Sequence, residues 1–398
     1  MNKWKPHKLS EIGSVVGGAT PSTTVDAYYN GDIPWLTPKD LSDFHERYIE
    51  RGERNITKSG LNSCSAQLLP AGSVLFSSRA PIGYVAIAKN PIATNQGFKS
   101  IIPNPEKVDS LFLYYLLRYN KDNIEAMGSG TTFKEVSGAT MKNIEVYLPE
   151  DLDEQRRIAG ILGSLDDKIE LNRRINANLE AQAQALFRSW FVDFEPFRDG
   201  PFVDSELGKI PQGWKVAELG DVTKQQTEKV GPQKTVKVLS PITTGELVLS
   251  EEYFTKQVFS ESITKYIIVK PNQFAYNPAR INIGSIGRNT FEFDGCVSPV
   301  YVVFECEKGY HYFFDFFRKT DAFKQEVISR AIGGVRQTLG YKDFALIKVI
   351  YPPQNVVLEF NTIYTNLLNL QNHNNIEVKN LSALRDTLLP KLMAGEIK

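Results

Sequence analysis

The segment QRRIAGILGSLDDKIELNRRINANLEAQAQALF, residues 155–187, predicts one long helix, because it contains no proline and its apolar residues recur with helical spacing. The positions at alternating spacings of four and three are Ile158, Leu162, Leu165, Ile169, Asn172, Asn176, Leu179, Ala183 and Leu186. Seven of these nine residues are apolar, and such a sustained heptad pattern is typical of a coiled coil. A single amphipathic helix lying on a domain remains the alternative.

A second segment of the same character, residues 357–389, supplies a partner for the first. Its expected seam consists of Phe360, Ile363, Leu367, Leu370, Asn374, Glu377, Leu381, Leu384 and Leu388. A helix over residues 155–187 extends about 50 Å, which matches roughly 15 base pairs of duplex DNA. A rod of this length suits two separate binding patches on one long ligand.

The sequence outside these helices is duplicated. WKPHKLSEI at 4–12 matches WKVAELGDV at 214–222, and LPAGSVLFSSRAPIG at 69–83 matches KPNQFAYNPARINIG at 270–284. Both copies have short apolar runs broken by Gly, Pro, Asn and Ser, which is typical of β-rich domains. The order of the matches is conserved, so the chain is predicted to contain two related domains.

We therefore expect an α+β protein that consists of two repeated α/β domains and two helical spacers. The expected domains are residues 1–150 and 207–352, and the expected spacers are residues 151–206 and 353–398. The two asparagines Asn172 and Asn374 are equivalent by the repeat, and Asn172 lies near the middle of its helix. In an antiparallel pair with a pseudo-two-fold axis they would meet and fix the register of the coiled coil; exposure of both to solvent is the alternative.

Composition excludes several classes of protein. The 46 Lys and Arg residues balance the 46 Asp and Glu residues, so bulk charge indicates no partner. The three cysteines and four histidines are far apart, without the spacing of a metal site. The sequence has neither a secretory signal nor a membrane-spanning apolar run of ~18 residues. We expect a cytoplasmic protein that binds no metal.

Catalytic motifs are also absent from the sequence. Neither a phosphate-binding GxxxxGK[ST] loop nor a GxGxxG turn is present. The run Tyr276-Asn277-Pro278-Ala279-Arg280 is superficially like an adenine methyltransferase motif, but it lacks the second proline and the aromatic residue that would stack on a flipped base. The sequence favours a binding protein, and two alternatives stay open: a DNA methyltransferase in its own right, and a scaffold that joins proteins without contacting DNA.

Several loops carry side chains suited to DNA. An arginine contacts guanine in a bidentate manner, and Asn or Gln reads adenine, whereas Gly-rich turns with hydroxyl and basic groups bind phosphates. The candidate DNA-binding residues on these grounds are Thr37, Lys39, Arg79, Asn95, Gln96, Thr131, Thr132, Lys134, Asn277, Arg280, Arg288, Arg336, Gln337, Thr338 and Lys342. A surface ion pair, an ordinary turn and a helix C-cap are the corresponding structural explanations.

Three segments identify a family. ALFRSWFVDFEPF at 185–197, DSELGKIPQGW at 204–214 and RDTLLPKLMAGEI at 385–397 closely resemble the conserved segments of type I restriction-modification specificity (S) subunits. The flanking EQRRIAGILGSLDDKIELNRRIN at 154–176 fits the same pattern. The resemblance covers essentially the whole chain, including the duplication.

The resemblance implies a fold, a function and a set of partners. Such subunits have two target recognition domains, separated by conserved helices that pair as an antiparallel coiled coil. They bind a split, asymmetric double-stranded DNA sequence, together with two modification (M) subunits and two restriction (R) subunits. S-adenosylmethionine, ATP and magnesium are then used by those partners, and the specificity subunit itself is not catalytic. Because recognition domains vary freely between relatives, the resemblance transfers no base-reading residue to this chain.

Overall fold

The computed structural model describes residues 4–130, 134–232, 236–331 and 338–397. The chain divides into two compact units, which we call unit 1 (Met1–Asn176 and Asn372–Lys398) and unit 2 (Ala177–Gln371). Both divisions fall inside a long helix, so each long helix contributes to both units. The four-segment division expected from the sequence stays a prediction.

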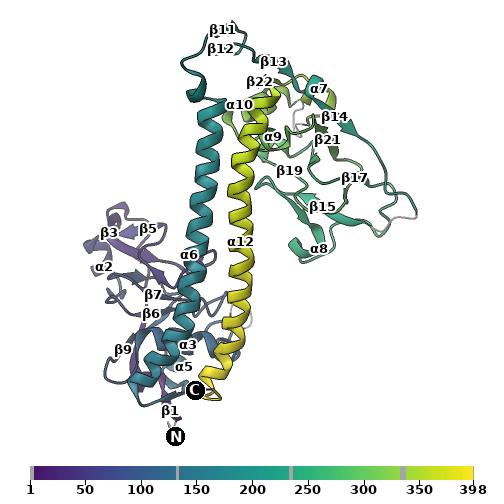
Figure 1. Ribbon diagram of the computed structural model, residues 1–398. Coiled ribbons are helices and arrows are strands. Elements are labelled where there is room, and N and C mark those ends of the chain that lie inside the picture. Colours follow the sequence, from purple (N-terminus) through teal and green to yellow (C-terminus); the bar gives the residue numbers. More distant parts are fainter. Residues whose placement is uncertain (1–3, 131–133, 233–235, 332–337, 398) are drawn as a thin grey trace. The chain divides into compact units, whose positions relative to one another are not determined.

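The two long helices are α6 (Leu152–Phe191) and α12 (Gln354–Met393), each of 40 residues (Figure 1). The side chain of Asp151 accepts a hydrogen bond from the backbone N–H of Asp153 at 3.0 Å, as expected of a residue that caps a helix. Pro353 precedes the first residue of α12, where a proline's missing N–H costs nothing. Gly395 follows the end of α12 with φ of 69°, the left-handed conformation that commonly terminates helices.

Contacts within each unit show that the helices run antiparallel. In unit 1, Asp166 bonds to Arg385, whereas the later residue Asn176 bonds to the earlier residue Asn375. In unit 2, Phe191 at the end of α6 packs on Phe360 near the start of α12, with ring centroids 5.0 Å apart. The predicted fold class of repeated α/β domains with an antiparallel helix pair is confirmed.

The predicted seam holds for α6 but fails in part for α12. Ile158, Leu162, Ile169, Asn172, Leu179 and Ala183 are buried. On α12, by contrast, the predicted seam residues Ile363, Leu370 and Leu384 are exposed. Tyr364, adjacent to Ile363, is buried in their place. Apolar residues lie on several faces of α12, so its sequence is compatible with more than one heptad register.

The described residues of unit 1 form ten strands in three sheets. Its strands are β1 (Trp4–Lys8), β2 (Gly13–Gly17), β3 (Tyr29–Leu36), β4 (Tyr48–Ile49), β5 (Arg54–Ile56), β6 (Val74–Phe76), β7 (Val85–Ala88), β8 (Ala93–Thr94), β9 (Lys99–Pro103) and β10 (Glu145–Pro149). They form a five-stranded sheet of order β2-β9-β6-β7-β4, a three-stranded sheet of order β5-β3-β8 and the pair β1-β10. The shorter helices of the unit are α1 (Leu9–Ile12), η1 (Asp26–Tyr28), η2 (Pro38–Leu41), α2 (Lys58–Asn62), α3 (Ser110–Tyr119), α4 (Lys121–Ala126) and α5 (Gly138–Asn143).

Unit 2 has twelve strands among its described residues. They are β11 (Phe202–Ser205), β12 (Gly208–Pro211), β13 (Lys215–Glu218), β14 (Thr223–Gln226), β15 (Lys237–Pro241), β16 (Leu247–Leu249), β17 (Ile267–Val269), β18 (Phe274–Tyr276), β19 (Ile286–Arg288), β20 (Gly295–Val297), β21 (Val302–Cys306) and β22 (Lys348–Tyr351). The sheets have the orders β14-β21-β18-β19, β16-β15-β20-β17, β13-β22 and β11-β12. The shorter helices are η3 (Glu195–Phe197), α7 (Leu219–Val222), α8 (Ser250–Tyr253), η4 (Ile281–Ile283), α9 (His311–Phe317), α10 (Asp321–Arg330) and α11 (Tyr341–Phe344).

The two units repeat one topology. The sheet order β2-β9-β6-β7 in unit 1 corresponds to β14-β21-β18-β19 in unit 2. Each unit also has an equivalent parallel pair, β3 with β8 and β15 with β20, and unit 1 has a further parallel pair, β4 with β7. The pair β1-β10 likewise corresponds to β13-β22. Since strand order and direction both recur, the duplication read from the sequence extends to the fold.

Each unit has its own apolar core. In unit 1, Phe76 of β6 and Phe112 and Tyr115 of α3 are completely buried. In unit 2, Phe274 of β18 and Phe304 of β21 stack with centroids 5.3 Å apart, and Phe314 of α9 contacts both rings. Burial of these large rings fixes the strands from whose ends the candidate loops emerge.

Candidate nucleic-acid interface

Three loops of unit 1 that carry candidate residues meet at one place. The backbone N–H of Ser78, which precedes Arg79, donates to the carbonyl of Gly97 at 2.7 Å. The carbonyl of Ser78 accepts from the N–H of Val136 at 2.9 Å. These bonds connect the β6–β7 loop with the β8–β9 turn and with the chain that follows residue 133. Ser78 is thereby bonded to residues 19 and 58 positions further along the chain.

Arg79 lies in an ion-pair cluster at this junction. Its Nε donates to Glu135 Oε2 at 2.9 Å, and Lys99 Nζ lies 3.4 Å from the other carboxylate oxygen, Oε1. The Arg79 side chain is 45% exposed, whereas that of Lys99 is only 14% exposed. Partial burial alone would raise the pKa of the Glu135 carboxyl, but the hydrogen bonds and charges of Arg79 and Lys99 lower it below its ordinary value. The cluster has a net positive charge.

The β8–β9 turn places two amides beside this cluster. Asn95 Oδ1 accepts from the backbone N–H of Gly97 at 2.8 Å, so its oxygen closes the turn. Gln96 is exposed, and its Oε1 accepts a hydrogen bond from the hydroxyl of Thr20. A Cβ at Gly97 would lie 2.7 Å from Cγ of Pro38, so glycine is required where this turn contacts the Thr37–Lys39 segment.

The Thr37–Lys39 segment is the fourth predicted motif of unit 1, and it adjoins the same turn. The backbone N–H of Asn95 donates to the carbonyl of Leu36 at 2.8 Å. The Asp40 carboxylate accepts from the backbone N–H of Thr37 at 2.7 Å, which caps η2, and from Thr37 Oγ1 at 2.8 Å, while Lys39 forms an exposed ion pair with Glu53 at 3.1 Å. Lys134 is half-buried next to Glu135, while Thr131 and Thr132 lie outside the described residues.

In unit 2, the equivalent loops carry fewer of the predicted groups. Asn277 Oδ1 accepts from the N–H of Ala279 at 3.0 Å, so it closes a turn, and Arg280 is exposed. Thr338 and Lys342 are also exposed. Arg336 and Gln337 lie outside the described residues.

Arg79 and Arg280 do not occupy identical positions, contrary to the sequence alignment. The N–H of Val136 bonds to the carbonyl of Ser78, and the N–H of Leu339 makes the corresponding bond to the carbonyl of Pro278. Arg79 directly follows its bonded residue, whereas Arg280 comes one residue later. The loop of unit 2 contains an extra residue, so the two arginines emerge differently from equivalent strands.

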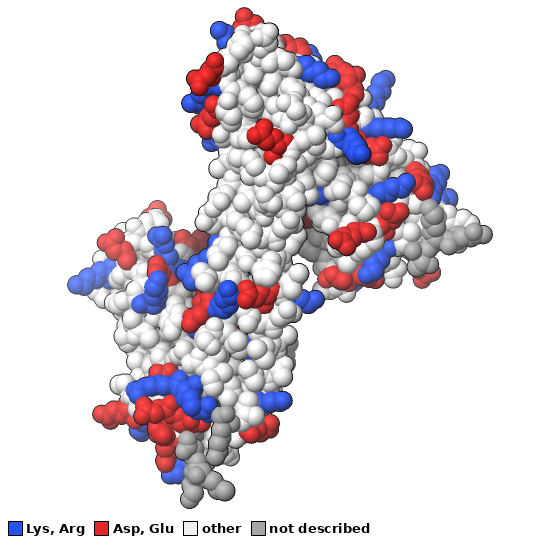
Figure 2. Space-filling view, in the orientation of Figure 1, with Lys and Arg blue, Asp and Glu red and all other residues white. Residues whose placement is uncertain are grey.

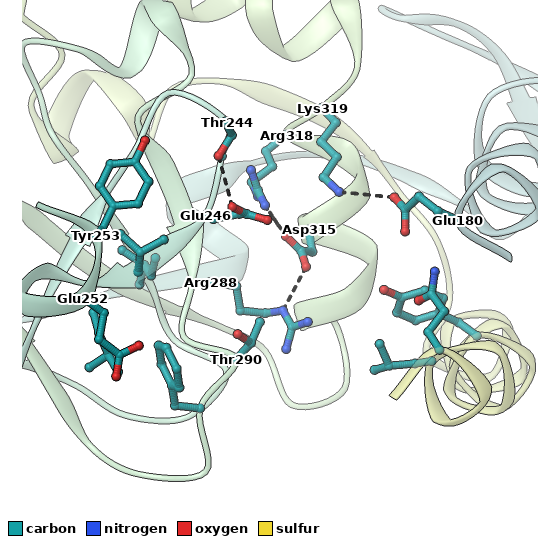
Figure 3. Close-up of a pocket in the computed structure, with 18 residues that line it drawn as sticks. Glu180, Thr244, Glu246, Glu252, Tyr253, Arg288, Thr290, Asp315, Arg318 and Lys319 are labelled. Carbon is teal, nitrogen blue, oxygen red and sulfur yellow. Dashed lines mark hydrogen bonds and ion pairs between the residues drawn. The ribbon is translucent and has the colours of Figure 1, made fainter. Parts of the chain in front are cut away.

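The prediction that Arg288 contacts DNA is wrong. Its side chain is 7% exposed, and its Nε donates to Asp315 at 3.0 Å while Nη1 donates to Asn272 at 2.7 Å. Asp315 also pairs with Arg318, so one carboxylate lies between two buried guanidinium groups (Figure 3). All three residues of β19 are buried, so the strand carries Arg288 into the interior of the unit, on the same face as Ile286.

Arg288 instead lines a cavity of about 560 Å³ within unit 2. Glu180 of α6 and Tyr364 of α12 form part of its wall, and Glu180 pairs with Lys319 at 3.8 Å (Figure 3). Acidic and basic groups are mixed around this cavity, and the ion pairs connect the β-rich part of unit 2 to the long helices.

The predicted contact between Asn172 and Asn374 is also wrong. Asn172 is buried, and its Nδ2 donates to Glu377 Oε2 at 2.7 Å, while Asn374 Nδ2 donates to Asn176 Oδ1 at 2.9 Å. Both asparagines lie in the helix pair, but Asn172 faces Glu377 and Asn374 faces Asn176, so the two repeat-equivalent residues are not opposite each other. The middle of a helix does not determine its register; the facing side chains do.

Sequence reasoning missed Glu135, Lys99 and Thr20. Lys99 follows the candidate residues Asn95 and Gln96 in the sequence, yet a lysine after a turn gives no signal of a partner 36 residues away. Glu135 directly follows the candidates Thr131, Thr132 and Lys134, but a carboxylate has no affinity for phosphates. Only the fold places its carboxylate against Arg79.

Two further properties of the described residues bear on function. No group of three or more His, Cys, Asp or Glu side chains in this part of the chain is arranged to hold a metal ion. No helix within the described ranges is both long enough and apolar enough to cross a membrane.

These features define a class: a duplicated α+β protein in which two mixed β-domains, each with polar and basic loops, are carried by an antiparallel pair of long helices. Residues 1–181 match the family model of the type I restriction modification DNA specificity domain. The chain is 36% identical to the type I restriction enzyme MjaIX specificity subunit of Methanocaldococcus jannaschii, over 99% of this chain and 94% of that protein. The chain therefore belongs to the type I restriction enzyme specificity subunits, and its role is DNA recognition.

Two other comparisons agree with this assignment. The type I restriction enzyme HindI specificity subunit of Haemophilus influenzae is 24% identical, and the match covers both chains completely. The solved structure of the type I restriction-modification S subunit from M. genitalium superimposes with a TM-score of 0.58 at 16% identity, covering 98% of this chain and 96% of that one. At that identity the likeness concerns the fold alone.

Proposed function

We propose that this chain is the non-catalytic specificity subunit that binds a bipartite, asymmetric DNA target, with each repeat reading one half-site. The observation that carries the proposal is the recurrence of one topology with different loop side chains. The loops that follow β6 and β8 carry Arg79, Asn95 and Gln96 in one repeat, and the loop that follows β18, the equivalent of β6, carries Asn277 and Arg280 in the other. Because the two repeats share a fold but carry different loop side chains, we expect the two half-sites to differ in sequence.

The proposed partners are double-stranded DNA, two modification subunits and two restriction subunits. The chemistry is assigned to those partners: S-adenosylmethionine for adenine methylation, and ATP with magnesium for restriction. We propose that this chain itself binds none of these cofactors. The proposed cytoplasmic location follows from the substrate, since a complex that methylates host DNA must meet it there.

The surface charge supports cooperation with such partners. On the face that Figure 2 shows, the described Lys and Arg side chains are interspersed with Asp and Glu, and the surface over α6 and α12 is largely uncharged. Affinity for DNA rises with the number of phosphates that basic groups neutralise. We therefore expect weak DNA binding by the isolated chain and much stronger binding once the modification subunits are present.

Methylation profiling of host adenines tests the function directly. The expected result is a split motif whose two halves differ, and loss of that methylation when the gene for this chain is deleted. An undivided motif would contradict the bipartite proposal. Methyl transfer by the purified chain alone would identify a methyltransferase, and absence of any sequence preference in a mobility shift with the modification subunits would favour a scaffold.

Replacement of Arg79 by Ala should then weaken binding of the target by ~1–3 kcal/mol, the contribution of a bidentate contact with guanine. The loss should depend on the sequence of one half-site, and titration of duplexes with a base changed in either half measures it. Equal weakening on all DNA would instead assign Arg79 to a phosphate, and an unchanged affinity would leave it as a surface ion pair.

A further inference from the structure

We infer that Glu135 is a positioning residue that orients Arg79 toward a guanine and so sets the base preference of the first repeat. The inference rests on the proposed function. It concerns a carboxylate that carries no obvious DNA-binding chemistry, since phosphates repel it. Its contribution would be to specificity, at some cost in affinity.

The first part of the argument is the geometry of the guanidinium. Glu135 Oε2 engages Nε of Arg79 at 2.9 Å. An arginine has five N–H donors in a rigid fork, and the bidentate contact with guanine O6 and N7 takes two of them. With Nε held by the carboxylate, the terminal Nη groups remain to form that contact. The side chain is exposed enough to do so.

The second part is the rigidity of the carboxylate. Lys99, which is nearly buried, holds Oε1 at 3.4 Å. The backbone of Glu135 exchanges two hydrogen bonds with Ser129, at 2.8 and 2.9 Å, and the next residue bonds to the carbonyl of Ser78. Glu135 is thus fixed through its side chain and its backbone. A contact group held in place before binding loses less conformational entropy and tolerates fewer partner geometries.

The third part is the contrast with the second repeat. The hydrogen bond from Val136 to Ser78 corresponds to that from Leu339 to Pro278, so Thr338 occupies the position of Glu135. Threonine has no charge to hold a guanidinium. Arg280 is exposed, and Asp315, the acidic residue that pairs with arginines in this unit, binds Arg288 and Arg318. Among the described residues, the arginine held by a carboxylate at this loop therefore belongs to the first repeat.

The inference predicts opposite effects on specific and nonspecific binding. Glu135→Gln is nearly isosteric and removes one negative charge beside Arg79 and Lys99. The more positive face should bind random DNA equally well or more tightly, with a salt dependence steeper by up to about one phosphate contact. The preference for guanine should fall by about fivefold or more, within the roughly 5- to 150-fold range of a bidentate contact.

The experiment uses the full chain assembled with its modification subunits. Selection from a random duplex pool first gives the target of the unaltered complex, and the Glu135→Gln complex is then selected from the same pool. We expect relaxed preference at one guanine of one half-site, an unchanged second half-site and unreduced nonspecific affinity. Glu50→Gln, which breaks the exposed ion pair with Lys89 in the same unit, is the matched control and should leave both half-sites unchanged.

Two further measurements distinguish failure of this inference from failure of the proposed function. In an Arg79→Gln background, Glu135→Gln should have no additional effect on base preference, because the carboxylate acts through Arg79. An unchanged preference in the single variant, or uniform loss of binding with a lower unfolding temperature, would overturn the inference. If the unaltered complex selects no sequence at all, the proposed function fails, and that failure is visible before any variant is made.

Discussion

The two units attach their β-rich parts to the long helices by different interactions. In unit 1, buried ionic groups form much of the contact: Arg47 donates to Glu170 at 3.0 Å, and Asp166 accepts from Arg385 at 2.6 Å and from the hydroxyl of Tyr115 at 2.7 Å. In unit 2, aromatic rings form much of the contact with the long helices. Phe187 of α6 lies between Phe316 of α9, at 5.2 Å, and Phe360 of α12, at 6.1 Å.

The difference arises at equivalent positions. Arg118 of α3 and Arg318, which directly follows α9, correspond in the repeat, and so do Tyr115 and Asp315. In unit 1 the acid that pairs with the arginine, Asp166, comes from the long helix. In unit 2 the acid is Asp315, on the short helix α9 that Arg318 follows. Both units pack apolar residues against the long helices, but unit 1 adds buried ion pairs, whereas in unit 2 the ion pair of Lys319 with Glu180 of α6 is partly exposed and aromatic packing contributes more.

The largest effect should come from breaking the ring contact in unit 2. Phe187→Ala removes a side chain that contacts four other rings, so the free energy of unfolding of unit 2 should fall by ~4 kcal/mol. Hydrogen exchange read by mass spectrometry reports each unit separately. Phe202→Ala, at a partly exposed position of the same unit, is the control and should change little. A similar loss in both variants would contradict the assigned role of the ring cluster.

A somewhat smaller effect should come from breaking the ionic contact in unit 1. Arg47→Ala leaves the nearly buried Glu170 without its cation, which should destabilise unit 1 by ~3 kcal/mol and leave unit 2 unchanged. The same exchange measurement tests it. Arg156→Ala breaks an exposed pair with Asp153 and should cost under about 1 kcal/mol. Equal protection of unit 1 in all three proteins would mean that the buried pair contributes nothing.

The third prediction uses pH to separate the two units. Burial acts to raise the pKa of the Asp315 carboxyl, but Arg318 and Arg288 hold it below its ordinary value of 3.8. A carboxyl with a lowered pKa stabilises the fold fully above its unfolded pKa, and this stabilisation is lost as the pH falls through the folded pKa. Unit 2 should therefore lose stability on acidification below about pH 4 through this group.

Asp315→Asn tests that linkage. The variant should be less stable at pH 7 by ~2 kcal/mol, because the amide accepts hydrogen bonds without a charge, and it should lose less on acidification than the natural protein. Unfolding measured from pH 7 to pH 3 gives both quantities. Asp321→Asn, at an exposed ion pair with Lys324, serves as the control. Parallel pH profiles for the natural protein and Asp315→Asn would exclude Asp315 as the source of the acid sensitivity.

The candidate interface was only partly predictable. Arg79, Asn95, Gln96 and Lys39 were identified because their chemistry suits bases and phosphates, and the fold brings their loops together. Arg288 has the same chemistry, yet its strand turns it toward Asp315. Residue type reports what a side chain is able to bind, whereas the face of the strand determines whether it is able to reach a ligand.

By itself, the sequence determined the duplication, the two long helices and the family, because each depends on local patterns that recur in order along the chain. The sequence also determined which residues of α6 form the buried seam, since its apolar residues lie on one face of the helix. Only the tertiary structure decided the register of the helix pair, in which Asn172 faces Glu377, and the one-residue difference between Arg79 and Arg280. It also decided that Glu135 lies against Arg79. These features depend on contacts between residues far apart in the chain, and many alternative pairings are compatible with the same local pattern.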